Sequence, residues 1–174
     1  GITFAPGKFG KAVQTPRATT NLVGNPSFEV GTTGWSNYST GAATGTRTRV
    51  TTEAYAGSYS YELVKVTGAV GERWGASTSV SVTSGTTYTV SAWVYIVSSV
   101  GGTQVFAMET GGALSGTTTS IAGATQGWTR ITRTMTASST GNGLVFLYVA
   151  NASDMTVHID AVQVEAVAYA TAYC

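Results

Sequence analysis

Short runs of alternating apolar and polar residues dominate this chain, and turns rich in Gly, Ser and Thr separate them. Successive side chains of a β-strand point to opposite faces, so a period of two is typical of strands. No segment keeps the 3.6-residue period of an amphipathic helix. The clearest runs are 46–52, 58–66, 77–84, 87–99, 103–110, 128–137, 143–151 and 155–165. Evenly spaced short strands predict an all-β fold, a β-sandwich of jelly-roll type with two antiparallel sheets.

Two of the runs are apolar on both faces. One carries Trp93 and Tyr95 on one face and small aliphatic residues on the other, and a later run does the same with Phe146 and Tyr148. A two-layer sandwich buries only one face of each sheet, and the small aliphatic positions suit that core. We therefore expect the aromatic positions of both runs on the outer surface of one sheet. The alternative for Trp93 is a core position with the two faces exchanged.

Length and composition favour one domain and exclude several classes of partner. The 174 residues suit a single domain, and only 10% are charged, against about 25% in a typical domain. The net charge is +1 without a basic run, which disfavours nucleic acid. The sequence has no stretch of roughly 18 consecutive apolar residues, so no membrane span is predicted. Cys174 is the only cysteine, so no internal disulfide forms.

Five sequence motifs follow one another in order: NLVGNPSFEVGTTGW (21–35), AYAGSYSYELV (54–64), GTTYTVSAWVYI (85–96), GWTRITRTMTAS (127–138) and VHIDAVQVE (157–165). Together they resemble the carbohydrate-binding modules of the family 4/9 type. Such modules occur in bacterial glycan-active enzymes and in phage tail and bacterial surface proteins. The resemblance implies a jelly roll that binds a polysaccharide or oligosaccharide without cleaving it. It also implies an extracellular, cell-surface or virion-associated location.

The resemblance divides the chain into three parts. Residues 1–20, rich in Gly, Pro and Lys, are interpreted as a leader or linker that adds at most one edge strand. Residues 21–167 form the predicted sandwich. The tail 168–174 looks like a segment that joins such a module to the next domain of a larger chain.

Two carboxylates raise the question of a metal. Asp160 lies in the middle of a strand-like run, in alternation with Val162 and Val164, so it is predicted to be buried. A buried, unpaired carboxylate costs several kcal/mol, so Asp160 needs a cation or several backbone N–H donors. Glu29, directly after Phe28, poses the same problem near the first strand, which a jelly roll brings close to the last.

A hard divalent cation with additional carbonyl ligands satisfies both carboxylates. The resemblance implies a structural Ca²⁺ held by Glu29, by the Gly57-Ser58 loop with Ser58 as a ligand, and by Asp160. The alternative is that backbone amides or an arginine cap the two carboxylates.

Aromatic rings and planar polar groups are the side chains that bind sugars, because sugar rings have apolar C–H faces edged by hydroxyls. The predicted ligand-binding residues are Arg73, Trp74, Trp93, Tyr95, Gln104, Glu109 and Tyr148. Arg73 and Trp74 are expected at one rim of the face that carries Trp93 and Tyr95. Trp35 and Trp128 each follow a glycine and are expected to close the ends of the core.

Catalytic chemistry has little support in the sequence. His158 is the only histidine and alternates with core-type residues, so zinc sites and Cys-His catalysis are excluded. No nucleophile elbow or phosphate loop is found. Glu72 and Glu109 are the remaining candidates for a glycosidase pair. We therefore expect a binding domain and no enzyme. The rival is a structural or adhesion domain of a phage tail or bacterial surface protein without its own sugar affinity.

Overall fold

The computed structural model describes residues 19–98, 106–125, 127–150 and 155–174, and these form ten strands without a helix. The strands are β1 (Ser36–Ser39), β2 (Thr44–Val50), β3 (Ser60–Thr67), β4 (Trp74–Val82), β5 (Thr87–Ser98), β6 (Phe106–Gly112), β7 (Thr117–Ile121), β8 (Thr129–Thr136), β9 (Gly141–Val149) and β10 (Met155–Glu165). No helix that could cross a membrane is found among these residues. The predicted leader lies outside them up to residue 18.

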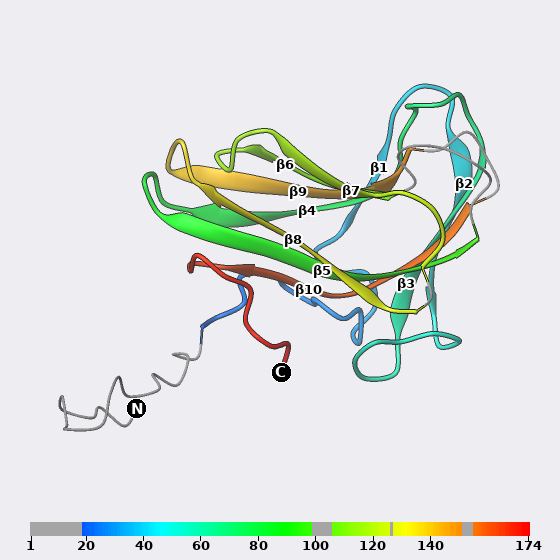
Figure 1. The fold of residues 1–174 in the computed structure, drawn as a ribbon, viewed down its shortest axis with the longest axis horizontal. Coiled ribbons are helices and arrows are strands. Elements are labelled where there is room, and N and C mark those ends of the chain that lie inside the picture. The colour runs from blue at the N-terminus through cyan, green and yellow to red at the C-terminus, as the bar shows by residue number, and fades with distance from the viewer. Residues whose placement is uncertain (1–18, 99–105, 126, 151–154) are drawn as a thin grey trace.

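The strands form two antiparallel five-stranded sheets, packed as the two layers of a sandwich (Figure 1). Sheet A has the order β1-β4-β9-β6-β7, and sheet B has the order β2-β3-β10-β5-β8. The prediction of an all-β jelly-roll sandwich is confirmed. Both the segment that begins at residue 19 and the C-terminal tail lie beneath β10, on the side of sheet B that faces away from sheet A (Figure 1).

Aliphatic side chains fill the space between the sheets. The fully buried ones include Val90, Val94 and Ile96 of β5 and Val145, Leu147 and Val149 of β9. Each such side chain contributes about 1.5–3 kcal/mol to folding by leaving water. Trp93 and Tyr95 are half-buried on the opposite face of β5, so the predicted orientation of β5 is confirmed.

The two aromatic faces lie on different sheets. Trp93 and Tyr95 belong to β5 of sheet B, whereas Phe146 and Tyr148 belong to β9 of sheet A. The prediction that they share the outer surface of one sheet is therefore wrong. Alternation shows which residues of a strand share a face, but pairing with distant strands decides which strands share a sheet.

Trp35 and Trp128 have different environments. Trp35 packs against the core, 5.0 Å from the Phe28 ring, and its Nε1 donates to the carbonyl of Asn25 at 3.1 Å, so its predicted packing role is confirmed. Trp128 instead packs against Tyr55 and Tyr95 on the outside of sheet B, so its predicted core position is wrong. Trp128 points to the same side as the outward-facing residues of β8, which is the side away from the core.

A β-bulge in β10 reverses the predicted alternation around Asp160. The pairing of β10 with β5 shifts register between Asp160 and Gln163, and Ala161 has a φ of +48°. Val162 and Val164 therefore face the core, whereas Asp160 pairs with Trp93 and shares the outer face of sheet B. Asp160 is buried as predicted, but on the outer face, where the loop between β2 and β3 covers it. The extra residue of the bulge shifts the alternation, so the valines after it face the core and Asp160 does not.

Candidate functional site

The outer face of sheet A combines large side chains on its central strand with mostly small ones, apart from Glu109, on the two neighbouring strands. Two rows of residues paired across adjacent strands form the middle of this face: Tyr38–Gly75–Tyr148–Ala107 and Ser77–Phe146–Glu109. A Cβ on Gly75 would lie 2.0 Å from the carbonyl oxygen of Leu147, so only glycine allows this close approach of β4 to β9. The aromatic residues of β9 thus lie between two strips of small residues.

A polar network crosses this face. Nη1 of Arg73 lies 2.9 Å from Oε2 of Glu109 and donates to the hydroxyl of Tyr38 at 2.7 Å. The hydroxyl of Tyr148 donates to the same Glu109 oxygen at 2.8 Å, and the Arg73 guanidinium lies 4.6 Å from the Tyr148 ring centroid. The side chains of Arg73 and Glu109 are 32% and 23% exposed, so both reach solvent. The network therefore presents fixed donors and acceptors at the surface.

The network also fixes the charges of its members. Burial, together with the hydrogen bond to Glu109, raises the pKa of Tyr148, so its phenol stays neutral. Burial opposes the charge of Arg73, but the Tyr38 hydrogen bond and the nearby Tyr148 and Glu109 hold its pKa above the ordinary value. The face therefore carries one cation beside one carboxylate, and their opposite charges compensate each other.

Tyr38 and Phe146 supply the aromatic surface. Their ring centroids are 4.7 Å apart, and the rings of Tyr38 and Tyr148 meet edge to face with centroids 5.7 Å apart. Tyr148 is only 3% exposed and supports the network from below, whereas Tyr38 and Phe146 are half-buried. Sequence reasoning missed Tyr38, because β1 has only four residues and is too short to show alternation.

Trp74 does not join its neighbour Arg73. Its indole Nε1 donates to the carbonyl of Thr46 at 3.1 Å, and the Arg47 guanidinium lies 3.4 Å from its ring centroid. The prediction that Trp74 stands with Arg73 at the rim of the Trp93 face is wrong in its geometry. Adjacent residues of a strand point to opposite faces. Trp74 therefore points to the same side of β4 as the core-facing Ala76, and Arg73 points to the other side.

The predicted site residues are thus divided among several places. Arg73, Glu109 and Tyr148 come together on sheet A, and Trp93 and Tyr95 lie on sheet B. Gln104 lies outside the described residues.

The outer face of sheet B carries its own aromatic cluster. Tyr55 stacks on Trp93 with centroids 3.9 Å apart, and Trp128 lies within 6.0 Å of Tyr55 and 6.1 Å of Tyr95. Tyr95 in turn stacks on His158 at 6.1 Å. Nε1 of Trp93 is buried and has no hydrogen-bond partner among the residues that the structure describes. The Arg130 guanidinium lies 6.0 Å from the centroid of the Trp93 ring, so this aromatic cluster also has a cation beside it.

Backbone amides surround the carboxylate of Asp160. Its Oδ2 accepts from the N–H groups of Tyr55 at 2.7 Å and Ala56 at 2.9 Å, and its Oδ1 accepts from Ala161 at 2.6 Å. Burial raises the pKa of Asp160 to about 6; the three amides act in the opposite direction, and the charge of Glu29 adds to the rise. The amides therefore compensate only part of the cost of burying this charge.

Glu29 meets the same loop. Its Oε1 accepts from the N–H groups of Ser58 at 3.0 Å and Tyr59 at 2.9 Å, and a Cβ on Gly57 would lie 2.6 Å from that oxygen. In the described part of the chain no cluster of three or more His, Cys, Asp or Glu side chains could hold a metal. A cation here would thus have two carboxylates and would take its other ligands from backbone oxygens, a donor set that fits calcium.

The residues considered for catalysis have structural contacts. His158 is buried, its Nε2 lies 3.8 Å from Glu62, and burial lowers its pKa, so the ring is neutral. The carboxylate of Glu72 accepts from the N–H groups of Ala42 at 3.0 Å and Ala69 at 2.8 Å and joins two loops. Glu109 belongs to the network on sheet A.

This jelly roll carries aromatic rings and an Arg–Glu pair on one open sheet face, groups of the kind that bind sugars. A family model described as a carbohydrate binding domain (CBM_4_9) matches residues 20–154, and the chain belongs to this family. Membership gives the function at the level of a class, the binding of a polysaccharide or oligosaccharide. No curated protein sequence matches the chain.

Several solved structures share the fold. TmCBM61 in complex with β-1,4-galactotriose has a TM-score of 0.61 at 19% identity and covers 83% of this chain and 97% of its own. The CBM22-1 xylan-binding domain of Paenibacillus barcinonensis Xyn10C has a TM-score of 0.56 at 23% identity, with 90% and 100% covered. The enzymatically active domain of bacteriophage CBA120 tailspike protein 4 has a TM-score of 0.62 at 16% identity, with 84% and 21% covered.

Proposed function

We propose that the chain binds an uncharged polysaccharide or oligosaccharide, without cleaving it, through the outer face of sheet A. The observation that carries the proposal is the Arg73–Glu109–Tyr148 network beside the half-exposed rings of Tyr38 and Phe146. Arginine donates to sugar hydroxyls through its planar fork, and the carboxylate accepts from them. The two rings offer apolar surface to the C–H faces of the sugar. Because the two charges compensate each other, the face suits a neutral glycan.

Substitution of Arg73 tests this site. Arg73→Met is expected to weaken glycan binding roughly 10- to 100-fold, the usual effect of losing an anchoring side chain of about 1–3 kcal/mol. Stability should change little, because the side chain is partly exposed. Affinity electrophoresis against a panel of neutral polysaccharides measures the loss, and Arg133→Met, which removes an exposed arginine on β8, is the matched control. Equal affinity of Arg73→Met and the unchanged chain would place the site elsewhere.

A second candidate site for the same function is the face of sheet B around Trp93 and Tyr95. The buried, unpartnered Nε1 of Trp93 favours it, because native proteins rarely leave a buried donor unsatisfied. Trp93→Ala, measured for melting and glycan affinity side by side, separates the two faces. If sheet A is the site, affinity stays unchanged while stability falls by about 1–2 kcal/mol through the lost stacking on Tyr55. If Trp93→Ala lost glycan affinity while Arg73→Met kept it, the site would lie on sheet B.

We also propose a structural Ca²⁺ between Glu29 and Asp160. Both carboxylates bind the loop between β2 and β3, Glu29 from before it in the sequence and Asp160 from after it. Their mutual repulsion contributes to the raised pKa of Asp160. The chemistry that the ion supplies is neutralisation of this paired charge. Glu29 and Asp160 would hold it together with backbone oxygens of the Gly57-Ser58 loop.

The proposed setting is a larger extracellular or virion-associated protein, in which this chain is one module. Similar folds in a xylan-binding domain and in part of a phage tailspike support this setting. The alternative remains a structural or adhesion domain of such a protein, and it predicts no affinity for any polysaccharide of the panel.

A further inference from the structure

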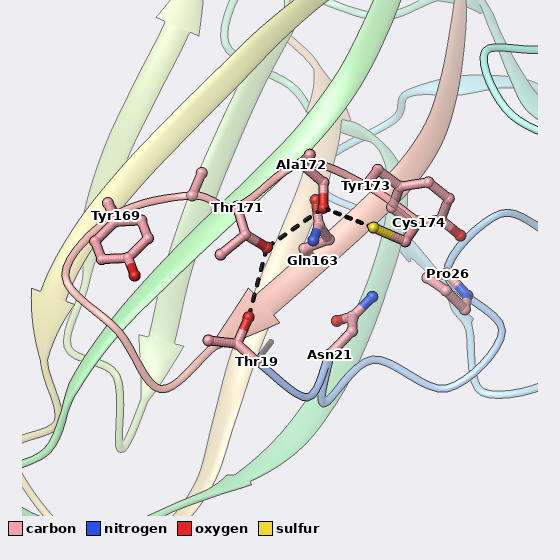
Figure 2. Close-up of a pocket in the computed structure, with 10 residues that line it drawn as sticks. Thr19, Asn21, Pro26, Gln163, Tyr169, Thr171, Ala172, Tyr173 and Cys174 are labelled. Atoms are coloured by element: carbon pink, nitrogen blue, oxygen red, sulfur yellow. Dashed lines mark hydrogen bonds between the residues drawn. The ribbon is translucent and has the colours of Figure 1, made fainter. Parts of the chain in front are cut away.

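A pocket of about 660 Å³ lies on the opposite side of the sandwich from the sheet A face. Its walls are the tail 169–174 and the segment that contains Thr19, Asn21 and Pro26, and Gln163 of β10 lies between them (Figure 2). Gln163 pairs with Ser91 on the outer face of sheet B. A concave site of this size lies within the range of small-ligand pockets, about 300–1,000 Å³.

The tail that forms one wall is anchored to the sandwich. The N–H of Thr171 donates to Oε2 of Glu165 at 3.0 Å, and the hydroxyls of Thr171 and Thr19 both donate to Oε1 of the same carboxylate. Thr89 of β5 donates to the carbonyl of Val167 at 2.8 Å. Glu165 is buried, and although burial opposes its charge, these hydrogen bonds hold its pKa below the ordinary value. The tail therefore has a defined position on the sandwich.

The opposite wall is held just as firmly. Asn21 donates to the carbonyl of Val162 at 2.9 Å and accepts from the N–H groups of Val23 at 3.1 Å and Val164 at 3.0 Å. The N–H of Val162 donates to the carbonyl of Pro26 at 2.9 Å. These bonds satisfy the backbone of β10 after its bulge. The pocket is therefore preformed between two fixed segments.

Gln163 supplies an oriented polar group. Its Oε1 accepts from Nη2 of Arg130 at 2.6 Å. Because arginine can only donate, the contacting atom is the amide oxygen, and the donor nitrogen of the amide is directed away from Arg130. Gln163 is buried, so its amide is available only to groups that enter the pocket.

The lining chemistry defines the class of ligand. None of the described residues that line the pocket is Asp, Glu, Lys, Arg or His, and the neighbouring carboxylate of Glu165 accepts from the two threonines and an amide. Tyr169 and Tyr173 provide aromatic rings, and Gln163 provides a planar amide. Aromatic rings with planar amides and hydroxyls are the side chains that recognise uncharged sugars.

We propose that this pocket binds the end of a short uncharged oligosaccharide, as a second sugar site independent of the sheet A face. The choice of ligand class rests on the proposed function, but the site itself does not. An open sheet face suits the interior of a glycan chain, whereas a pocket with walls on two sides suits a chain end. The two sites face opposite sides of the sandwich, so one molecule can hold two glycans.

Cys174 provides a direct test, because it lines the pocket, is exposed and is the only cysteine. Its alkylation rate is measured with a panel of neutral di- to tetrasaccharides. At a concentration of about ten times Kd, mass action leaves about 10% of the pocket free, so alkylation slows about tenfold. Tyr169→Ala, which removes a 50% exposed ring, should abolish this protection, and Tyr55→Ala, which removes a 39% exposed ring outside the pocket, should not.

Two further comparisons decide the outcome. Protection that persists in Arg73→Met supports an independent site, and protection that disappears in this variant overturns it. Equal alkylation rates with and without every sugar of the panel also overturn the proposal, as does protection by a short neutral peptide alone. Affinity electrophoresis on the same samples reports the sheet A face, so failure of the pocket is distinguished from failure of the proposed function.

Discussion

Calcium is expected to raise the melting temperature of metal-free protein at pH 7.5 by about 5–10 °C. An ion that binds only the native state at about 100 times its Kd stabilises it by roughly 2.7 kcal/mol. For a domain of this size each kcal/mol corresponds to about 2–4 °C. The proposed ion would bind Glu29 and Asp160, and the backbone amides compensate only part of the cost of burying the charge of Asp160. Differential scanning calorimetry with and without EDTA measures the shift.

The pH dependence of the metal-free protein gives an independent check. Asp160 has a pKa of about 6 in the folded chain and about 3.9 when unfolded. Between these values the unfolded state binds fewer protons than the folded state, so the free energy of unfolding falls as pH rises. The expected loss between about pH 4 and 6 is roughly 2–3 kcal/mol. Bound calcium should reverse this trend, because the ion requires the ionised carboxylate.

Two variants separate the ion from general effects of calcium. Asp160→Asn and Glu29→Gln should each remove most of the calcium response, whereas Glu62→Gln, a carboxylate on β3 away from the Gly57-Ser58 loop, should retain it. An unchanged melting curve in excess EDTA, together with no metal in the purified protein, would contradict the site. In that case amide capping alone stabilises both carboxylates.

Phe28→Ala is expected to lower the free energy of unfolding by about 3–5 kcal/mol, as for other large-to-small changes in a core. Phe28 is fully buried and lies 5.0 Å from the rings of both Tyr61 and Trp35. Its φ of +59° places it in a left-handed turn, and the next residue, Glu29, reaches the Gly57-Ser58 loop from there. Equilibrium unfolding in urea measures the loss.

Val30→Ala is the matched control for Phe28→Ala. Val30 lies two residues further along the same segment and is 80% exposed, so its truncation should change stability by less than about 0.5 kcal/mol. A loss below about 1 kcal/mol for Phe28→Ala would show that the first segment is not part of the cooperative core. Sugar affinity per folded molecule should stay the same in both variants, since neither side chain belongs to the sheet A network.

The sequence by itself determined eight of the ten strands, the jelly-roll class and the family; it missed the short strands β1 and β7. It also determined which residues of β5 face the core, because alternation within a strand is a local property that hydrophobic burial enforces residue by residue. The approach of Glu29 and Asp160 to one loop followed from the resemblance. The position of the bulge at Ala161 did not, since one extra residue leaves no mark on composition.

Only the tertiary structure decided which aromatic residues lie side by side on one sheet face. Pairing over long sequence distances places Tyr148 on sheet A and Trp93 on sheet B, and it joins Arg73 to Tyr38 and Glu109. The pocket beneath sheet B likewise depends on contacts between Thr19 and Glu165, which are 146 residues apart. Hydrophobic alternation fixes the face of each side chain, but the register between distant strands fixes its neighbours, and sugar recognition depends on those neighbours.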